Sequence, residues 1–243
     1  MKQNKNHCVK IILSVGAIAC VVALAGCAGT RSTQGGGGGV PADYKGKPWQ
    51  DKAQVIPGKI HAAFYDLGGE GVAYHDTDPE INRGSGELNQ RPEQQMPESS
   101  PYYWNFRKNE GVDISYTKKP FDKNVEGKTE QFNILYVGWT HPGEWLNYTV
   151  KVKKAGTYTI NAHISAHGPD RCLSFDFNGE DKSGKILIRD TKGVHRWATY
   201  KNLGEVKLEK GLQVMTMHIV DNGDMNIDYV EFVPELETGE DGK

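Results

Sequence analysis

Alternating apolar and polar residues in two neighbouring stretches constrain the fold of this chain more than any other feature. Over residues 146–152 every second residue is apolar, and the same spacing returns over residues 158–164, after a turn at residues 155–157. A period of two places the apolar side chains on one face of a β-strand, as in a strand with one buried face. The short turn predicts that the two strands pair as an antiparallel hairpin.

More strand-like segments follow, separated by turns that contain Gly, Asn or Asp, and no segment predicts a helix. These segments are residues 173–177, 185–189, 205–208, 212–220 and 225–233. Short strands with regularly spaced turns are typical of all-β domains. We therefore expect a β-sandwich of the jelly-roll type, with an up-and-down barrel as the alternative.

The N-terminal residues have the features of a secretion signal. Basic residues precede an apolar run at residues 11–25, which ends in Leu24-Ala25-Gly26-Cys27. The run is short for a spanning helix, so we expect a signal peptide at residues 1–26. Its last residues resemble the site that is cut and lipidated in bacterial lipoproteins, which predicts that Cys27 carries the lipid. An uncleaved membrane anchor is the alternative. Either way the domain is expected at the cell envelope, with a lipid anchor in the outer membrane and its face undecided.

Composition then divides the remainder of the chain. Residues 27–55 contain the glycine run at 35–39 and predict a flexible tether. Residues 56–234 are long enough for one domain with its own core, and 235–243 form an acidic tail. Of the four cysteines only Cys172 falls in the domain, so no disulfide framework is expected.

The charge of the chain excludes one class of partner. The formal net charge is −2, and acidic and basic residues are interspersed. Nucleic-acid binding needs a basic face, which this sequence does not suggest. We expect no nucleic-acid partner.

Trp139 is the first candidate for ligand contact. It lies in a segment broken by Gly138, Pro142 and Gly143, where a loop position is favoured over a core position. A flat indole on a loop is suited to stacking on a ligand ring. Trp145, inside the alternating segment, is expected to be the core tryptophan of this region.

Four blocks of the sequence, in this order, resemble a family 6 carbohydrate-binding module. They are GKIHAAFYDLGGEGVAYHDT, VGWTHPGEWLNYTVKVKKAGTYTI, HRWATYKNLGEVKLEKGLQVMTMHI and MNIDYVEFV. The resemblance covers nearly the whole domain. It implies a galactose-binding-like jelly roll that holds β-linked polysaccharides, such as β-glucan, xylan or agar-like chains, without cutting them.

The resemblance also implies a site in the loops at one end of the sandwich. Two aromatic rings there clamp a sugar ring, and an Asn forms hydrogen bonds with it. Matched by position, the aromatics fall on Trp139 and Trp197 and the Asn on Asn226, provided that WATY is aligned with the family's WxTW segment through a one-residue gap. A stacking ring and an amide suit the apolar face and hydroxyl rim of a sugar. The alternative is that one or both tryptophans are core residues.

The chain departs from the family pattern in two places. Family members bind a structural calcium through a pair of Glu in the first strand, but Ile60-His61-Ala62-Ala63 has neither. We therefore predict no metal site, although oxygens such as those of Asp66 and Asp228 leave a structural calcium open. The second departure is an insertion at residues 78–109, whose aromatic residues 102–104 either extend the sugar site or anchor the loop.

Two other classes of function stay open. A glycoside hydrolase, or an accessory subunit of one, would need two carboxylates across a cleft. Many pairs can be proposed, but the resemblance implies that most of the carboxylates lie in turns or structural positions; the candidates are Glu70, Asp76, Asp113, Glu144, Asp176 and Asp228. A structural envelope lipoprotein would recognise protein instead. Our prediction is a non-enzymatic protein that binds polysaccharide at the envelope for polysaccharide-degrading enzymes or transporters.

Overall fold

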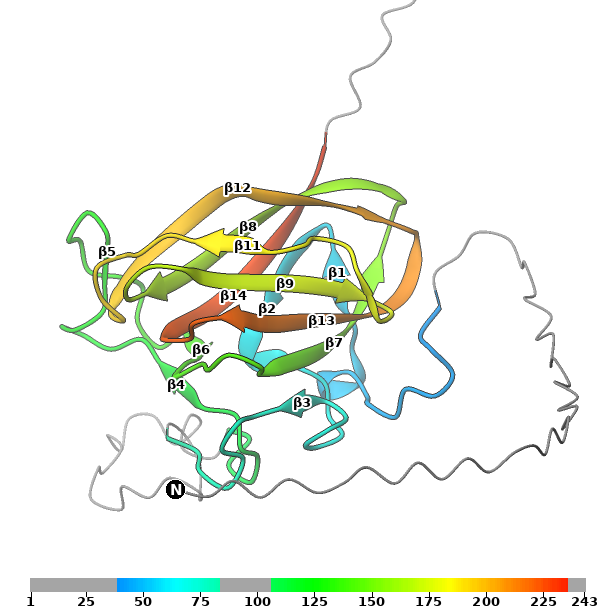
Figure 1. Ribbon diagram of the computed structural model, residues 1–243, viewed down its shortest axis with the longest axis horizontal. Coiled ribbons are helices and arrows are strands. Elements are labelled where there is room, and N and C mark those ends of the chain that lie inside the picture. Colours follow the sequence, from blue (N-terminus) through cyan, green and yellow to red (C-terminus); the bar gives the residue numbers. More distant parts are fainter. Residues whose placement is uncertain (1–38, 84–105, 236–243) are drawn as a thin grey trace, which may run out of the picture. The chain divides into compact units, whose positions relative to one another are not determined.

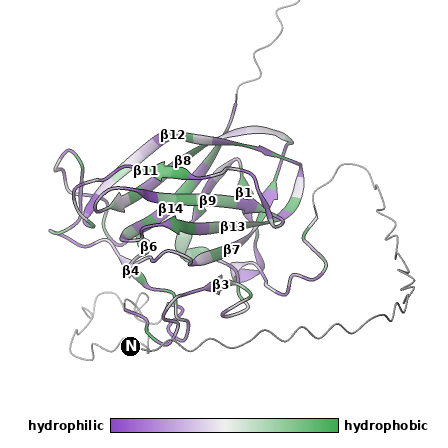
Figure 2. Cartoon of the chain, in the orientation of Figure 1, coloured by the Kyte–Doolittle hydropathy of each residue, from purple (hydrophilic) through white to green (hydrophobic). Residues whose placement is uncertain are grey.

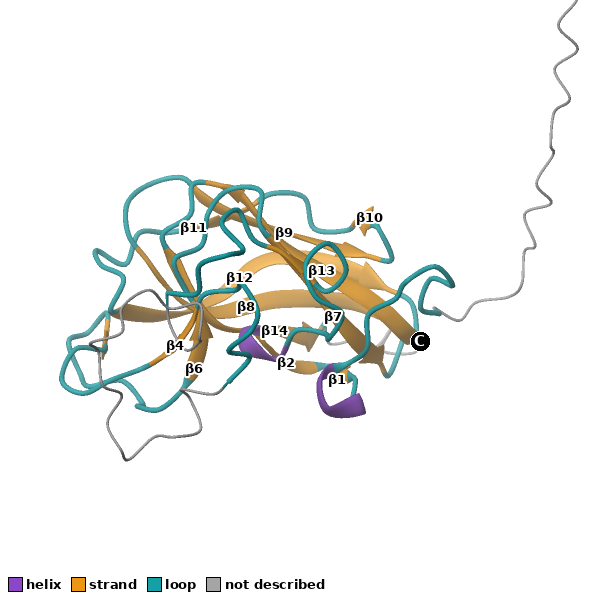
Figure 3. Ribbon diagram, turned by 90° about the horizontal axis from the view of Figure 1, so that it is seen from below, coloured by secondary structure: helices purple, strands orange, loops and turns teal. Residues whose placement is uncertain are grey.

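Two seven-stranded β-sheets make up the computed structural model, which describes residues 39–83 and 106–235 (Figure 1). The first sheet contains β1 (Gln54–Ile56), β3 (Tyr74–His75), β7 (Trp145–Val152), β9 (Arg171–Phe177), β10 (Glu180–Asp181), β11 (Ile186–Ile188) and β13 (Gly211–Asp221). The second contains β2 (Gly58–His61), β4 (Ile114–Tyr116), β5 (Lys123–Asn124), β6 (Leu135–Val137), β8 (Gly156–Ala166), β12 (Arg196–Leu208) and β14 (Met225–Pro234). Within the described ranges the helices are two single-turn 3-10 helices, η1 (Trp49–Asp51) and η2 (Ala62–Phe64) (Figure 3).

The long strands alternate between the sheets along the chain. β7, β13 and β9 are neighbours in the first sheet, and β14, β8 and β12 are neighbours in the second. The chain therefore crosses the sandwich at each step from β7 to β8, β9, β12, β13 and β14. This winding confirms the predicted jelly-roll sandwich and excludes the up-and-down barrel.

The predicted hairpin is wrong, because β7 and β8 lie in different sheets. β7 pairs with β13, and β8 pairs with β12 and β14. Each strand has one apolar face, as the alternation predicts, but the two faces meet across the core. Periodicity identifies the buried face of a strand and not its partner.

One core fills the space between the sheets. Phe175 and Phe177 of β9 contact Phe232 of β14, with ring centroids 6.0 and 5.8 Å apart, and all three rings are buried. Burial of each such ring stabilises the fold by about 1.5–3 kcal/mol. The hydrophobic residues accordingly concentrate on the strands (Figure 2). Cys172 on β9 is a free, buried thiol.

The N-terminal boundary of the domain lies earlier than expected. β1 pairs with β7 in parallel, Lys47 bridges to Leu67, and the hydroxyl of Tyr44 donates a hydrogen bond to Asp66 Oδ2 (2.7 Å). Part of the predicted tether at 27–55 therefore packs as part of the domain. No helix in the two described ranges is long and apolar enough to cross a membrane.

Several predicted features lie outside the described residues. These are the signal peptide at 1–26, Cys27, the glycine run up to residue 38, residues 84–105 of the insertion with its aromatic cluster, and residues 236–243 of the tail.

Candidate functional site

A groove crosses the outer face of the first sheet, and Trp145 forms part of its wall. We call it the sheet-face groove. Its volume is about 540 Å³. Trp145 is half-buried, so part of its indole is open to the groove, and the ring of His75 lies 6.2 Å away. The remaining walls come from the turns at residues 71–72 and 178–179, from β13 and from the N-terminal segment at 41–45.

Amide and hydroxyl groups line the same groove. Asn147 donates from Nδ2 to the carbonyl of Val72 (2.9 Å), and its Oδ1 accepts from Thr216 Oγ1 (2.6 Å). Asn178 accepts from the N–H of Val214 (2.9 Å). These bonds hold the amides in fixed orientations beside Trp145. The groove thus combines an aromatic face with preorganised polar groups.

The loop after β6 holds Trp139, and its preceding residue Gly138 lies against Asn226. Trp139 is 36% exposed and has a φ of +47°, an unusual backbone conformation for a bulky residue. A Cβ at Gly138 would lie 2.7 Å from Asn226 Oδ1, so only glycine lets the loop approach this closely. Asn226 itself is 6% exposed and donates from Nδ2 to the carbonyl of Val194 (2.6 Å). Part of the amide's bonding capacity is therefore used within the protein.

Trp197 does not form the second wall of a clamp, because its ring is completely buried. It is 0% exposed and donates from Nε1 to Asp122 Oδ1 (2.7 Å). Tyr136 and His163 each lie 5.2 Å from it, centroid to centroid. The strand register does bring Trp197 near Asn226, since both pair with Ser165 of β8. A buried ring cannot stack on a sugar, so the predicted pair Trp139 and Trp197 is corrected to Trp139 alone.

Residues 117–133, which we call the covering segment, seal Trp197 on the outer face of the second sheet. β5 of this segment pairs in parallel with β12 beside Trp197. Asp122 accepts from His195 Nδ1 (3.2 Å) and from the N–H of Lys118 (2.7 Å) as well as from the indole. One buried carboxylate thus fastens the segment to the tryptophan.

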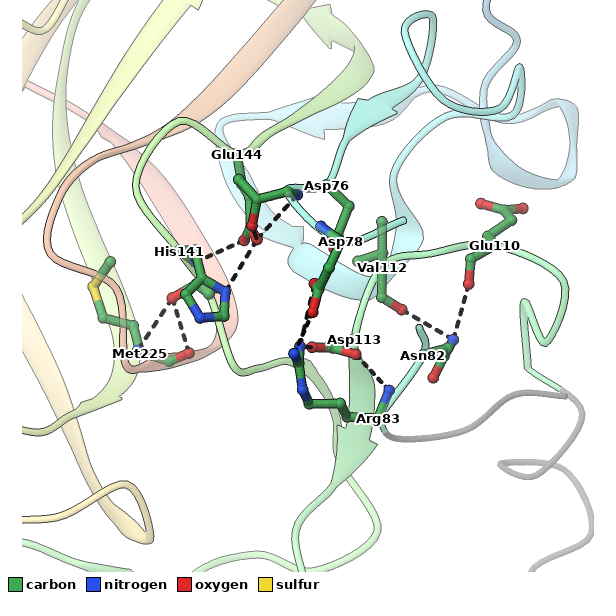
Figure 4. A network of polar contacts seen from close by, with 12 residues as sticks. Asp76, Asp78, Asn82, Arg83, Glu110, Val112, Asp113, His141, Glu144 and Met225 are labelled. Carbon is green, nitrogen blue, oxygen red and sulfur yellow. Dashed lines mark hydrogen bonds and ion pairs between the residues drawn. The ribbon is translucent and has the colours of Figure 1, made fainter. Parts of the chain in front are cut away.

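A polar network fixes the far side of the Trp139 loop (Figure 4). Glu144 accepts from the N–H of His141 (2.8 Å) and from Thr77 Oγ1 (2.9 Å). Nearby, Arg83 forms ion pairs with Asp78 and, at 2.7 Å, with Asp113. The loop is therefore tied to the segment at residues 76–83 and is held as a rigid support for Trp139.

Burial raises the pKa of two aspartates in this network. The pKa of Asp76 rises to about 8, through burial and then the nearby charge of Glu144, against the opposing hydrogen bond from the N–H of Asp78. The pKa of Asp113 rises to about 6, because burial outweighs its bonds with Arg83. Asp76 and Asp113 are 5% and 3% exposed. Both carboxyl groups are thus largely enclosed by the network that holds them.

One set of side chains has the spacing of metal ligands. Donor atoms of Asp78, His141 and Glu144 lie within 4.8 Å of one another. Each carboxylate already has protein partners, since Asp78 is paired with Arg83 and Glu144 accepts from His141 and Thr77. We therefore assign these three residues to the polar network that positions the Trp139 loop.

The two calcium candidates taken from the sequence lie in separate networks. Asp66 accepts from the N–H and hydroxyl of Thr149 (2.8 and 2.6 Å) and from Tyr44. Asp228 lies between His61 and His163, at 3.5 and 2.9 Å. The two carboxylates therefore have different protein partners.

Comparison with known families decides the class of this domain. Residues 123–232 match the model of the family described as "Carbohydrate binding module (family 35)". This region is a carbohydrate-binding module. The predicted class is confirmed, although the family model that matches is family 35 and the sequence resemblance was to family 6. The matched residues include Trp139, Trp145, Trp197 and Asn226.

Among solved structures, carbohydrate-binding modules of family 6 are similar to this chain. One is the β-1,3-glucan binding module from Bacillus halodurans, with a TM-score of 0.46 and 13% identity over 75% of this chain and 99% of that one. A second is the module of Cellvibrio mixtus lichenase 5A in complex with cellotriose, with a TM-score of 0.42 and 21% identity over 52% of this chain and 88% of that one. A third is a module from Clostridium stercorarium in complex with cellobiose, with a TM-score of 0.45 and 9% identity over 76% and 98% of the two chains. No curated protein matches the sequence.

Trp145 lines the candidate site although its position in the sequence predicts a core residue. Its place at the start of an alternating strand favoured the core, but it occupies the polar phase of that strand, opposite to Leu146 and Tyr148. The position of Trp145 among the polar, outward-facing residues of the strand was the signal available in the sequence. A tryptophan on the solvent-facing phase of a strand indicates a surface role.

Proposed function

We propose that the module binds a β-linked polysaccharide along the sheet-face groove, with Trp145 as its stacking surface. The observation that carries this proposal is the half-buried indole in the wall of an open groove lined by fixed amides. Sugar rings present an apolar C–H face and a rim of hydroxyls, which an indole and neighbouring amides complement. The groove volume lies in the ordinary range of ligand pockets, roughly 300–1,000 Å³.

Trp139 and Asn226 offer a second, one-sided contact at the end loops. The exposed indole supplies a stacking face, and its support by Gly138 and Glu144 keeps it in place. Without an opposing ring it contributes less area than a clamp. We assign the main affinity to the sheet-face groove and a smaller share to this end.

Affinity gel electrophoresis of the full chain tests the function. Soluble β-glucan, xylan and agar-type chains are cast in separate gels, and an unrelated protein of similar size serves as the control. At least one of these polysaccharides should retard the chain. If none does, the chain does not bind these polysaccharides, and a protein-recognising envelope lipoprotein becomes the better explanation.

We further propose that the chain as a whole is not an enzyme. Carbohydrate-binding modules bind without cutting, and residues 123–232 match such a module. The carboxylates Asp76 and Asp113, which have raised pKa values, are buried. Sustained release of reducing ends from a polysaccharide that binds would contradict this.

We propose a location on the basis of the N-terminal sequence. A lipid on Cys27 would anchor the module at the outer membrane, where it would hold polysaccharide for degrading enzymes or transporters. Cys27→Ser should abolish incorporation of labelled fatty acid and change the fractionation of the protein. Labelling that persists in this variant would rule out the anchor.

No tightly bound calcium is part of the proposal. Asp66 and Asp228 are engaged in separate networks. Chelator should therefore leave the melting temperature nearly unchanged, because removal of a tightly bound ion would otherwise take binding free energy from the folded state. A large drop that calcium restores would reveal a site.

A further inference from the structure

A second groove lies outside the region that matches the family, between η1, β1 and the stretch from β2 to η2. We call it the N-terminal groove. Its volume is about 330 Å³. Its lining consists of Trp49, Gln50, Lys52, Gln54, Lys59 and Phe64, together with Ala53 and Val55. None of these residues belongs to residues 123–232.

Two aromatic rings that line this groove pack against Phe106. Trp49 and Phe64 are both half-buried, and their centroids lie 5.2 and 6.0 Å from that of Phe106. The guanidinium of Arg107 lies 5.0 Å from the Trp49 ring. Rings held in this way can offer their open faces to a ligand with little loss of side-chain entropy.

The backbone around the groove is also fixed. Gln54 accepts from the N–H of His61 (2.8 Å) and donates to the carbonyl of Phe64 (3.2 Å). These bonds tie β1 to η2, so the two sides of the groove keep their distance. The Gln54 amide is thereby occupied, and recognition of charge falls to the lysines.

The charged residues that line the groove are all basic. Lys52 and Lys59 are exposed, and no Asp or Glu lines the groove, although the chain has a net charge of −2. Among the described residues neither lysine forms an ion pair, and Lys59 Nζ lies 3.8 Å from the centre of the Tyr229 ring. The acidic residues closest in sequence or register are Asp51, next to Lys52, and Glu231, which pairs with Lys59 across β2 and β14 and accepts from Asn161 (3.2 Å).

We propose that the N-terminal groove binds an anionic saccharide. The sugar ring would stack on Trp49 and Phe64, and its negatively charged group would lie between Lys52 and Lys59. Charge-assisted hydrogen bonds from ammonium groups to carboxylate or sulfate are stronger than neutral ones. The proposal goes beyond the sheet-face groove, because it gives the chain a second site that selects for charge.

Isothermal titration calorimetry on the full chain tests the proposal. Three probes are compared at low and high salt: trigalacturonate, a sulfated galactose oligosaccharide and its unsulfated counterpart. We expect at least one charged probe to bind at least tenfold more tightly than the neutral one, with an affinity that falls as salt rises. Trigalacturonate alone would identify a uronate site, and the sulfated probe alone a sulfate site. Equal affinity for charged and neutral probes would overturn the proposal.

Variants then locate the binding. The double variant Lys52→Gln, Lys59→Gln should weaken binding of the charged probe by tenfold or more, without a change in melting temperature, since both side chains are exposed. Lys201→Gln, Lys207→Gln on β12 removes the same charge from exposed positions elsewhere and should leave binding unchanged. Equal losses in the two double variants would show that only net charge matters and would overturn the site.

Trp145→Ala separates this proposal from the sheet-face groove. It should strongly reduce retardation by neutral polysaccharide and leave binding of the charged probe intact. If the charged probe also needs Trp145, it binds in the sheet-face groove and the N-terminal groove is not a site. If neutral polysaccharide binds normally to this variant, the sheet-face proposal fails while the present one stands.

Discussion

Trp145 and Trp197 occupy corresponding places, one on the outer face of each sheet, yet one is open and the other sealed. Trp145 lines an open groove, and the neighbouring chain segments form the walls of this groove without covering the indole completely. Trp197 lies under the covering segment and gives its indole N–H to Asp122. The same residue type on the same kind of surface is thus a candidate ligand contact in one sheet and a structural anchor in the other.

The difference teaches that loops, more than strands, assign the role of an aromatic on the face of a sandwich. β7 and β12 both direct a tryptophan away from the core between the sheets. What distinguishes them is the covering segment, which pairs with β12 through only two residues of β5. A variant that affects either the covering of Trp197 or the ligand contact of Trp145, but not both, therefore tests this difference between the two tryptophans.

The largest expected effect is on stability, at Trp197. Trp197→Ala should lower the free energy of unfolding by about 3–5 kcal/mol, because it opens a cavity and leaves Asp122 without its indole donor. Thermal melts with circular dichroism measure this. Trp197→Phe keeps most of the bulk and should lose less. A Trp197→Ala protein that melts normally but no longer binds polysaccharide would show that the ring is uncovered in solution, and would restore the predicted clamp.

The next effect is on binding, at Trp145. Trp145→Ala should weaken polysaccharide binding by about 2 kcal/mol or more, as for an aromatic hot spot, with a small change in melting temperature. Calorimetry and melts on the same samples compare the two losses, and Trp145→Phe should retain part of the affinity. The opposite outcome is a Trp145→Ala protein that melts much earlier but binds polysaccharide normally at temperatures where it is folded. Trp145 would then be the core tryptophan that the sequence suggested.

The sequence predicted the fold far better than the roles of individual tryptophans. Alternation along β7 and β8 identified buried faces, so the class of fold was accessible from local pattern alone. The pairing partner of each strand could not be predicted from local pattern, because β7 and β8 face each other across the core and do not pair along an edge. The carbohydrate-binding class was accessible from ordered blocks, which record many positions at once.

The burial of Trp197 had no local signal. It depends on a contact between Asp122 and Trp197, 75 residues apart, made by a segment with a two-residue strand. Pattern analysis of residues 195–200 cannot detect such a contact. The N-terminal groove had no local signal either, because residues 47–55 have the composition of a tether and their place in the domain depends on pairing with Leu67 and β7.

A smaller effect is expected at Trp139. With no opposing ring, Trp139→Ala should weaken binding by about 1 kcal/mol, near the value of a single aromatic contact, and Asn226→Ala by about as much through a lost hydrogen bond. Calorimetry with the polysaccharide used for Trp145 gives a direct ranking. If Trp139→Ala costs more than Trp145→Ala, the end loops carry the main site and the sheet-face groove is secondary.

The smallest effect concerns the attachment of the covering segment, and it depends on pH. Burial works to raise the pKa of Asp122, but hydrogen bonds from His195, Trp197 and the N–H of Lys118 outweigh it and hold the pKa below its usual range. A carboxyl whose pKa is lowered by folding stabilises the protein above its unfolded value of ~3.9, and this contribution disappears as the pH falls through the lowered pKa. Asp122→Asn should therefore cost about 0.5–1 kcal/mol at neutral pH and progressively less as the solution is acidified below that value. Urea titrations at several pH values measure the difference, with the exposed Asp170→Asn as the matched control. If the cost of Asp122→Asn stays constant down to the lowest pH, the charge of Asp122 does not fasten the segment over Trp197, and packing alone keeps this tryptophan covered.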